Sequence, residues 1–185
     1  LAANSTRDRW REKSEGIGIK SADYVTAPSH DVLKCVRSRY QFDLPESAVI
    51  PNPIEAVVET TRWRLDDCDK QSLLFVGRFD EIKGGDFVVK VFAELARLYP
   101  RLRLTFVGPD IGVKGDGKSP ALFDEYAKKT LSFDALARVT FKGKLTSDEI
   151  RSLRNKHLIT LCAAQIEIFP YTVLEAMYHG CPIVA

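Results

Sequence analysis

The sequence contains no long apolar run, no paired cysteines and no strong excess of charge of either sign. Because no stretch of about 18 apolar residues occurs, no membrane span is expected. The net charge of +2 gives no indication of nucleic acid as a partner. No cluster of residues has metal-ligand spacing, so no metal site is expected. The absence of a CxxC pair favours free thiols in a reducing compartment; the cysteines are Cys35, Cys68, Cys162 and Cys181.

From residue 72 onward, apolar runs alternate with segments of helical periodicity. The apolar runs, typical of strands buried on both faces, cover residues 73–78, 102–108, 138–143 and 158–163, and a fifth begins at Pro182. Helices are expected between them, at residues 87–99, 121–132, 147–156 and between Glu167 and Gly180. This alternation predicts an α/β fold, with a Rossmann-like parallel sheet and helices on both faces.

Two of these helices have informative first turns. Asp86 follows a turn at Gly84 and Gly85, and we expect its carboxylate to cap the helix at 87–99. Thr146 and Glu149 have the spacing of a capping box at the start of the helix at 147–156.

The first 53 residues follow a different pattern. A short strand is expected at Tyr24–Ala27, followed by a helix capped by Ser29. Residues 49–54 indicate a strand broken by prolines. The polar residues 54–71 have no clear period. We therefore expect three parts: the tail of a first α/β domain at 1–53, a linker at 54–71 and a second domain at 72–185.

Charged side chains follow the first and fourth expected strands of the second domain. Arg78 and Lys83 come after the first strand, and Glu167 precedes the helix after the fourth. Ligands bind at the carboxyl ends of parallel strands, so these residues are expected at one edge of the sheet. Two cations and a helix N-terminus suit a ligand with two negative charges, such as a diphosphate.

Two carboxylates near such a site need a further reason, because they repel a phosphate. Glu167 and Glu175 are eight residues apart, and a carboxylate that accepts a hydrogen bond from a sugar hydroxyl contributes about 1.5–3 kcal/mol. A sugar–diphosphate–nucleoside ligand would use both carboxylates and both cations. The alternatives are surface charges for Arg78 and Lys83, a solvated loop position for Glu167, and a structural ion pair of Glu175 with Arg78 or Lys83.

Four segments resemble glycosyltransferase family 4, a retaining group with the GT-B fold of two Rossmann-like domains. They are VGRFDEIKGGD, FVGPD, FKGKLTSDEI and EIFPYTVLEAMYHGCPIVA. The resemblance covers residues 21–185 and concerns mainly the donor-binding half. It implies that the chain begins within the acceptor-binding domain and stops before the donor domain is complete.

The resemblance also implies roles for individual residues. Arg78 and Lys83 would hold the donor diphosphate, Glu167 would lie against the transferred sugar, and Glu175 would bind the ribose hydroxyls. Backbone groups around Phe169, Pro170, Tyr171 and Thr172 would face the phosphate and sugar, Gly77 would allow a close approach of the backbone, and Gly143 and Lys144 would lie near the base. Two positions depart from the usual pattern, because Pro170 and Pro53 stand where many members have glycine.

The function implied is transfer of a hexose-like sugar from a UDP- or GDP-linked donor to an acceptor hydroxyl, with retention and without a metal or other cofactor. Glycan or lipid-linked acceptors, as in polysaccharide biosynthesis, and a cytoplasmic location are expected. Peripheral contact with the inner face of a membrane would come through the acceptor domain. We expect the chain alone to be inactive. The alternatives are a GT-B nucleotide-sugar epimerase and a non-catalytic module that binds nucleotide-sugar.

Overall fold

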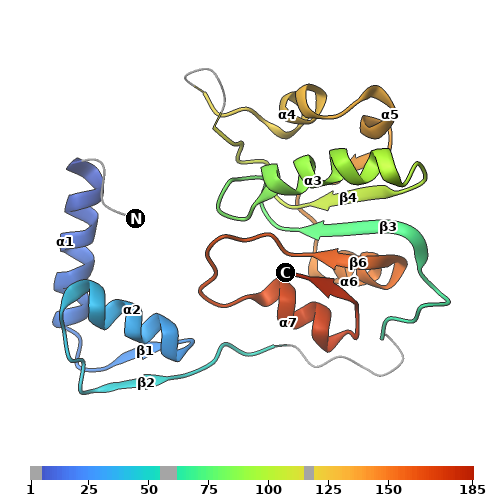
Figure 1. The fold of residues 1–185 in the computed structure, drawn as a ribbon. Coiled ribbons are helices and arrows are strands. Elements are labelled where there is room, and N and C mark those ends of the chain that lie inside the picture. Colours follow the sequence, from blue (N-terminus) through green and yellow to red (C-terminus); the bar gives the residue numbers. More distant parts are fainter. Residues whose placement is uncertain (1–5, 55–61, 115–118) are drawn as a thin grey trace. The chain divides into compact units, whose positions relative to one another are not determined.

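The computed structural model describes residues 6–54, 62–114 and 119–185 (Figure 1). The chain divides into two compact units, Leu1–Pro53 and Ile54–Ala185.

The first unit consists of α1 (Thr6–Lys20), β1 (Val25–Ala27), α2 (His30–Tyr40) and β2 (Ser47–Val49). The two strands pair in parallel, and a small core forms around Ala27, Leu33 and Leu44. Ser29 caps α2, because its Oγ accepts a hydrogen bond from Val32 N at 3.2 Å. The strand expected at 49–54 is wrong: β2 ends at Val49, where the prolines that follow cannot donate to a ladder. Helix α1 has no counterpart in the sequence-based expectations.

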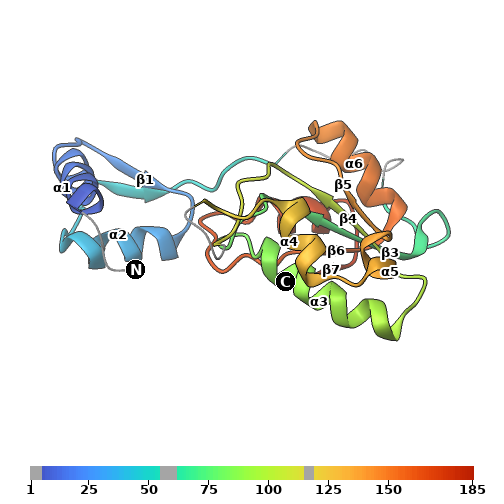
Figure 2. The ribbon, with the colours of Figure 1, turned by 90° about the horizontal axis from the view of Figure 1, so that it is seen from above.

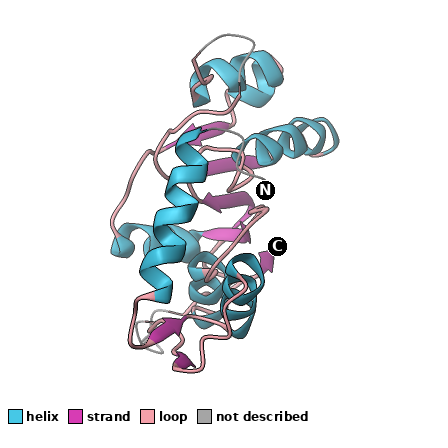
Figure 3. Ribbon diagram, turned by 90° about the vertical axis from the view of Figure 1, so that its left-hand side faces the viewer, coloured by secondary structure: helices cyan, strands magenta, loops and turns pink. Residues whose placement is uncertain are grey.

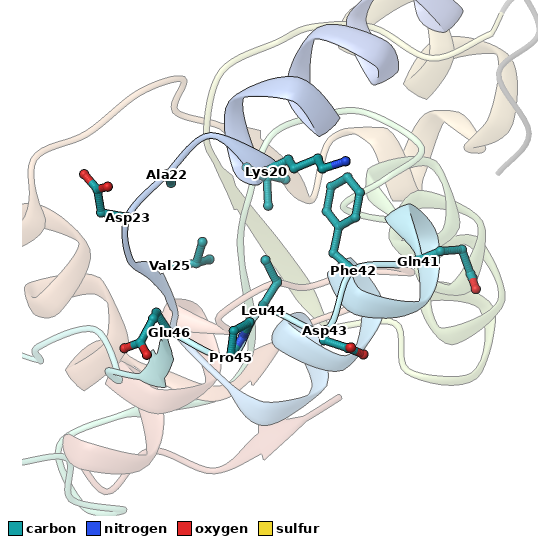
Figure 4. Close-up of a pocket in the computed structure, with 11 residues that line it drawn as sticks. Lys20, Ala22, Asp23, Val25, Gln41, Phe42, Asp43, Leu44, Pro45 and Glu46 are labelled. Carbon is teal, nitrogen blue, oxygen red and sulfur yellow. The ribbon is translucent and has the colours of Figure 1, made fainter.

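A pocket of about 430 Å³ lies in this unit, next to the end of α1 and the loop after α2 (Figure 4). Its lining combines apolar side chains with the carboxylates of Asp23, Asp43 and Glu46. None of the predicted site residues contributes to it.

The second unit contains a five-stranded parallel sheet, as predicted. The strands are β3 (Asp69–Val76), β4 (Arg103–Val107), β5 (Val139–Phe141), β6 (His157–Leu161) and β7 (Ile183–Val184). Their order is β5-β4-β3-β6-β7, and every neighbouring pair is parallel. The central strand β3 is almost entirely buried between residues 72 and 75, as its continuous apolar run predicts.

Helices connect these strands: α3 (Gly85–Leu98), α4 (Phe123–Thr130), α5 (Phe133–Leu136), α6 (Ser147–Lys156) and α7 (Tyr171–Tyr178). Figure 2 shows α3 and α5 on one side of the sheet and α6 on the other, and Figure 3 shows the strands as a layer between helices. The core against α3 and α4 is built on four aromatic rings: Phe79, Phe106 and Phe123 contact one another, and Phe75 contacts Phe106.

Two helix starts test the predicted caps. The capping box is confirmed, because Thr146 Oγ1 accepts from Glu149 N and Glu149 Oε2 accepts from Thr146 N. The prediction that Asp86 caps α3 is wrong. Gly84 is the N-cap, in the left-handed region with φ of 71°, and Asp86 lies inside the first turn, where it pairs with Lys90 at 3.0 Å.

The expected linker at 54–71 also needs a correction. β3 begins at Asp69, because Asp69 pairs with Arg103 of β4 and lies in register with His157 of β6. Residues 69–71 therefore belong to the sheet, and residues 55–61 lie outside the described residues.

The strand order defines where a ligand should bind. The chain leaves β3 toward β4 and β5 on one side, and later returns to add β6 and β7 on the other. In such sheets the crevice forms outside the carboxyl ends of the two strands at which the order reverses. Here these strands are β3 and β6.

Candidate functional site

The loop that leaves β3 is organised by Asp80, a residue that the sequence analysis did not select. Asp80 is buried. Its Oδ2 pairs with Arg78 Nε at 2.9 Å, and its Oδ1 accepts from the backbone N of Lys83 at 2.7 Å. One carboxylate thus holds both the Arg78 side chain and the backbone at Lys83. The Arg78 side chain remains 46% exposed, which leaves part of its guanidinium available to a ligand.

Two glycines bring this loop close to its neighbours. A Cβ built on Gly84 would lie 2.1 Å from the carbonyl oxygen of Ala163, which follows β6, and φ is 71° there. A Cβ on Gly77 would meet the Phe75 ring at 3.0 Å. Gly84 therefore allows the start of α3 to lie directly against the chain that leaves β6.

The loop after β6 reaches the same place. Gln165 N donates to Ile82 O at 2.9 Å, and Glu167 Oε1 lies 2.6 Å from Lys83 Nζ. The two side chains are 29% and 24% exposed, so water reaches the pair. The structure therefore brings Lys83 and Glu167 into direct contact beyond the carboxyl ends of β3 and β6.

Helix α7 starts at the same edge of the sheet. Thr172, in its first turn, donates its hydroxyl to the carbonyl of Val76, the last residue of β3, at 3.3 Å. The N-cap is Pro170, which has no side-chain cap. The backbone N of Tyr171 donates to Phe169 O at 2.9 Å. The first turn of a helix carries amide groups and a partial positive charge that suit an anion, and this turn of α7 lies against the end of β3, the strand that Arg78 and Lys83 follow.

Glu175 forms an ion pair, but with neither of the predicted partners. Its Oε2 lies 2.6 Å from Nη2 of Arg154, in the last turn of α6. The Arg154 side chain is 3% exposed and that of Glu175 is 40% exposed. Nothing in the sequence singled out Arg154, because this contact joins residues of two different helices, 21 positions apart in the chain.

The segment after β5 lies at the same edge of the sheet. Gly108 N, after β4, donates to Gly143 O at 2.8 Å, so the ends of β4 and β5 remain adjacent. Gly143 has φ of 64°, with open space where a Cβ would lie, and Lys144 is exposed. These residues follow β5, two strands away from β3, so they lie at the same edge of the sheet but farther from Lys83 and Glu167.

Two buried titratable groups, His157 and Cys181, have structural surroundings. His157 Nδ1 donates to Leu153 O at 2.6 Å, and Nε2 accepts from Thr105 Oγ1 at 2.8 Å. Burial lowers the pKa of His157 and raises the pKa of the Cys181 thiol to about 11. Both are therefore neutral at pH 7, and neither supplies charge to the crevice.

Within the described residues, His, Cys, Asp and Glu form no group of three or more that could hold a metal ion. In the same ranges, every helix is too short or too polar to span a bilayer.

Residues 59–185 match the family model for glycosyl transferases group 1, and the chain belongs to that family. Its α/β architecture is that of GT-B glycosyltransferases.

Individual relatives are distant. A D-inositol 3-phosphate glycosyltransferase from Nocardiopsis dassonvillei is 24% identical over 184 residues, which are 95% of this chain and 42% of that protein. The structure of WaaG, a glycosyltransferase involved in lipopolysaccharide biosynthesis, gives a TM-score of 0.71 at 18% identity, over 97% of this chain and 49% of that chain.

A second solved structure, the pneumococcal O-GlcNAc transferase GtfA in complex with UDP and GlcNAc, gives a TM-score of 0.65 at 19% identity. The match covers 92% of this chain and 31% of that one. The chain thus spans less than half the length of each of these proteins.

Proposed function

We propose that the second unit is the donor-binding half of a retaining, family 4 type glycosyltransferase that uses a nucleoside-diphosphate sugar. One observation carries the proposal: Arg78, Lys83, Glu167 and the first turn of α7 meet at the carboxyl ends of β3 and β6. This is the place where the strand order reverses and where such sheets bind ligands.

The cations would act on the leaving group. As the bond between sugar and diphosphate breaks, negative charge grows on the phosphate oxygens. Arg78 and Lys83 would stabilise that charge, and the amides of α7 would assist them. Asp80 holds the Arg78 side chain and the Lys83 backbone in place before any ligand binds, and preorganised groups of this kind are the main electrostatic source of rate enhancement. No metal or cofactor is needed for this role.

The carboxylates would act on hydroxyl groups. Glu167 is paired with Lys83, so its carboxylate would lie beside the diphosphate, where the transferred sugar begins. Glu175 lies more than one turn into α7, a position from which its carboxylate would accept hydrogen bonds from the ribose. Gly143 and Lys144 would lie on the side of the base.

The rest of the enzyme follows by analogy. GtfA was solved with UDP and GlcNAc, which supports a UDP-sugar, with a GDP-sugar as the alternative. Residues 1–53 would be the end of the acceptor-binding domain, so the 185-residue chain alone would bind donor without transferring it. The acceptor would be a glycan or a lipid-linked sugar, at the cytoplasmic face of a membrane. The family match does not favour the epimerase alternative.

Transfer can be tested with the full-length protein and radiolabelled UDP- or GDP-hexoses, with a panel of glycan and lipid-linked acceptors. We expect a product whose anomeric configuration, read by proton NMR, equals that of the donor, and a rate unchanged by EDTA. An inverted product would exclude the retaining mechanism. Loss of rate in EDTA would exclude the metal-independent one. Donor binding without turnover on any acceptor or water would support a non-catalytic binding module.

A further inference from the structure

The ion pair of Glu175 joins an accessible carboxylate to a buried cation. The side chain of Glu175 is 40% exposed, whereas that of Arg154, from α6, is only 3% exposed. A guanidinium at that depth requires a negative partner, and in the described part of the chain its ion-pair partner is Glu175. Its Nε makes no hydrogen bond there, so the contact through Nη2 is the interaction that balances its charge.

This contact constrains the carboxylate. A glutamate side chain on a helix surface has three rotatable bonds and samples several rotamers. Here Oε2 is held at 2.6 Å from Nη2, a short, charge-assisted hydrogen bond. Because Arg154 holds one oxygen, a ligand hydroxyl would be accepted by the other, Oε1. The buried guanidinium therefore restricts where Oε1 can point.

We propose that Arg154 is a positioning residue for the nucleoside part of the donor: it orients Glu175 so that this carboxylate selects ligands with ribose hydroxyls. The inference rests on the proposed function, in which Glu175 binds the ribose. Arg154 itself does not touch the ligand, and it acts through the carboxylate. A merely structural ion pair would stabilise the contact between α6 and α7 without affecting which nucleotide binds.

Ribose selectivity separates these two roles. Calorimetric titration of the full-length protein gives the dissociation constants of UDP and GDP, each compared with its 2′,3′-dideoxy analogue. Because a hydrogen bond to a charged group contributes about 1.5–3 kcal/mol, we expect the ribonucleotide to bind at least about tenfold more tightly. The ratio of the two constants does not depend on the fraction of folded protein.

Four variants then show which side chains cause the preference for the ribonucleotide over its dideoxy analogue. We expect Glu175→Gln and Arg154→Gln each to lower the ratio of the two dissociation constants from about tenfold to about threefold or less. Arg154→Lys should give an intermediate ratio, because a single ammonium replaces the planar guanidinium. Lys156→Gln removes an exposed cation from the same helix turn and should leave the ratio unchanged. If Arg154→Gln does not fold, Arg154→Lys provides the test.

Failure of the inference and failure of the proposed function look different. If neither UDP nor GDP binds to the folded wild-type protein, both are overturned. If the wild type binds and discriminates, but Arg154→Gln or Arg154→Lys retains the full ratio, the positioning role alone is overturned. The same holds if Lys156→Gln lowers the ratio as much as Arg154→Gln.

Discussion

Replacing Gly84 by alanine tests the close approach on which the crevice depends. The new Cβ would lie 2.1 Å from the carbonyl oxygen of Ala163 and 2.9 Å from its Cβ. The backbone would also have to keep φ at 71°, which costs an L-residue about 1–2 kcal/mol. Since the first clash is with a backbone oxygen, no side-chain rotation relieves it. The chain leaving β6 must move away from the start of α3.

Gly180 provides a matched control. It ends α7 with φ of 75°, and nothing lies within 4 Å of where its Cβ would be. Gly180→Ala therefore has the backbone cost without the clash, and we expect it to lower the free energy of unfolding by about 1 kcal/mol. In Gly84→Ala the steric clash adds to this cost, and we expect the free energy of unfolding to fall by at least about 3 kcal/mol in total.

Thermal unfolding of the chain, followed by far-UV circular dichroism, measures both effects. For a unit of this size, about 1 kcal/mol corresponds to roughly 3–4 °C. We therefore expect Tm to fall by about 3–4 °C in Gly180→Ala and by about 10 °C or more in Gly84→Ala. Equal shifts in the two variants would refute the reasoning, because they would mean that Gly84 does not lie against Ala163.

Three further predictions concern the site and its surroundings. Arg78→Ala or Lys83→Ala in the full-length enzyme should lower kcat by roughly 10²–10³, as for loss of one preorganised donor; a radiometric transfer assay that gives wild-type rates would exclude the assignment. Burial lowers the pKa of His157 below its ordinary 6.5, so the unfolded chain binds more protons below pH 6.5 and stability falls as pH drops through that range. The dependence of Tm on pH should be shallower in His157→Gln, and an unchanged slope would contradict this account. At pH 8, Ellman's reagent should modify the exposed Cys35 rapidly, whereas Cys181, buried and with its pKa raised to about 11, should react only on unfolding; fast labelling of both, read by mass spectrometry, would contradict its burial.

The sheet was predictable because its signals are local. β3 contains the apolar run at 73–76, β4 is mostly apolar, and the capping box of Thr146 and Glu149 lies within one turn. The cap of α3 was not predictable in this way. Asp86 is a residue type that commonly caps helices, but the helix starts earlier, because Gly84 in the left-handed region closes the loop that Asp80 organises.

The candidate site, too, was predictable from sequence only in part. The rule that ligands bind at the carboxyl ends of parallel strands led to Arg78, Lys83 and Glu167 as neighbours, and the structure has Lys83 and Glu167 in contact. The partner of Glu175 could not be found from sequence. Arg154 is one of several basic residues of α6, and only its burial and its contact with Glu175 of α7 in the folded chain distinguish it.

The central claim is that the carboxyl ends of β3 and β6 bind a nucleoside diphosphate. Titration with nucleotides tests this claim most directly. Calorimetry of the full-length protein with UDP and GDP should show binding of at least one of them. Arg78→Ala and Lys83→Ala should each weaken it by about tenfold or more. Arg97→Ala, which removes a 77% exposed arginine from α3, should bind as the wild type does. If the folded wild type binds neither nucleotide, or if all three variants bind as tightly as the wild type, the claim is wrong.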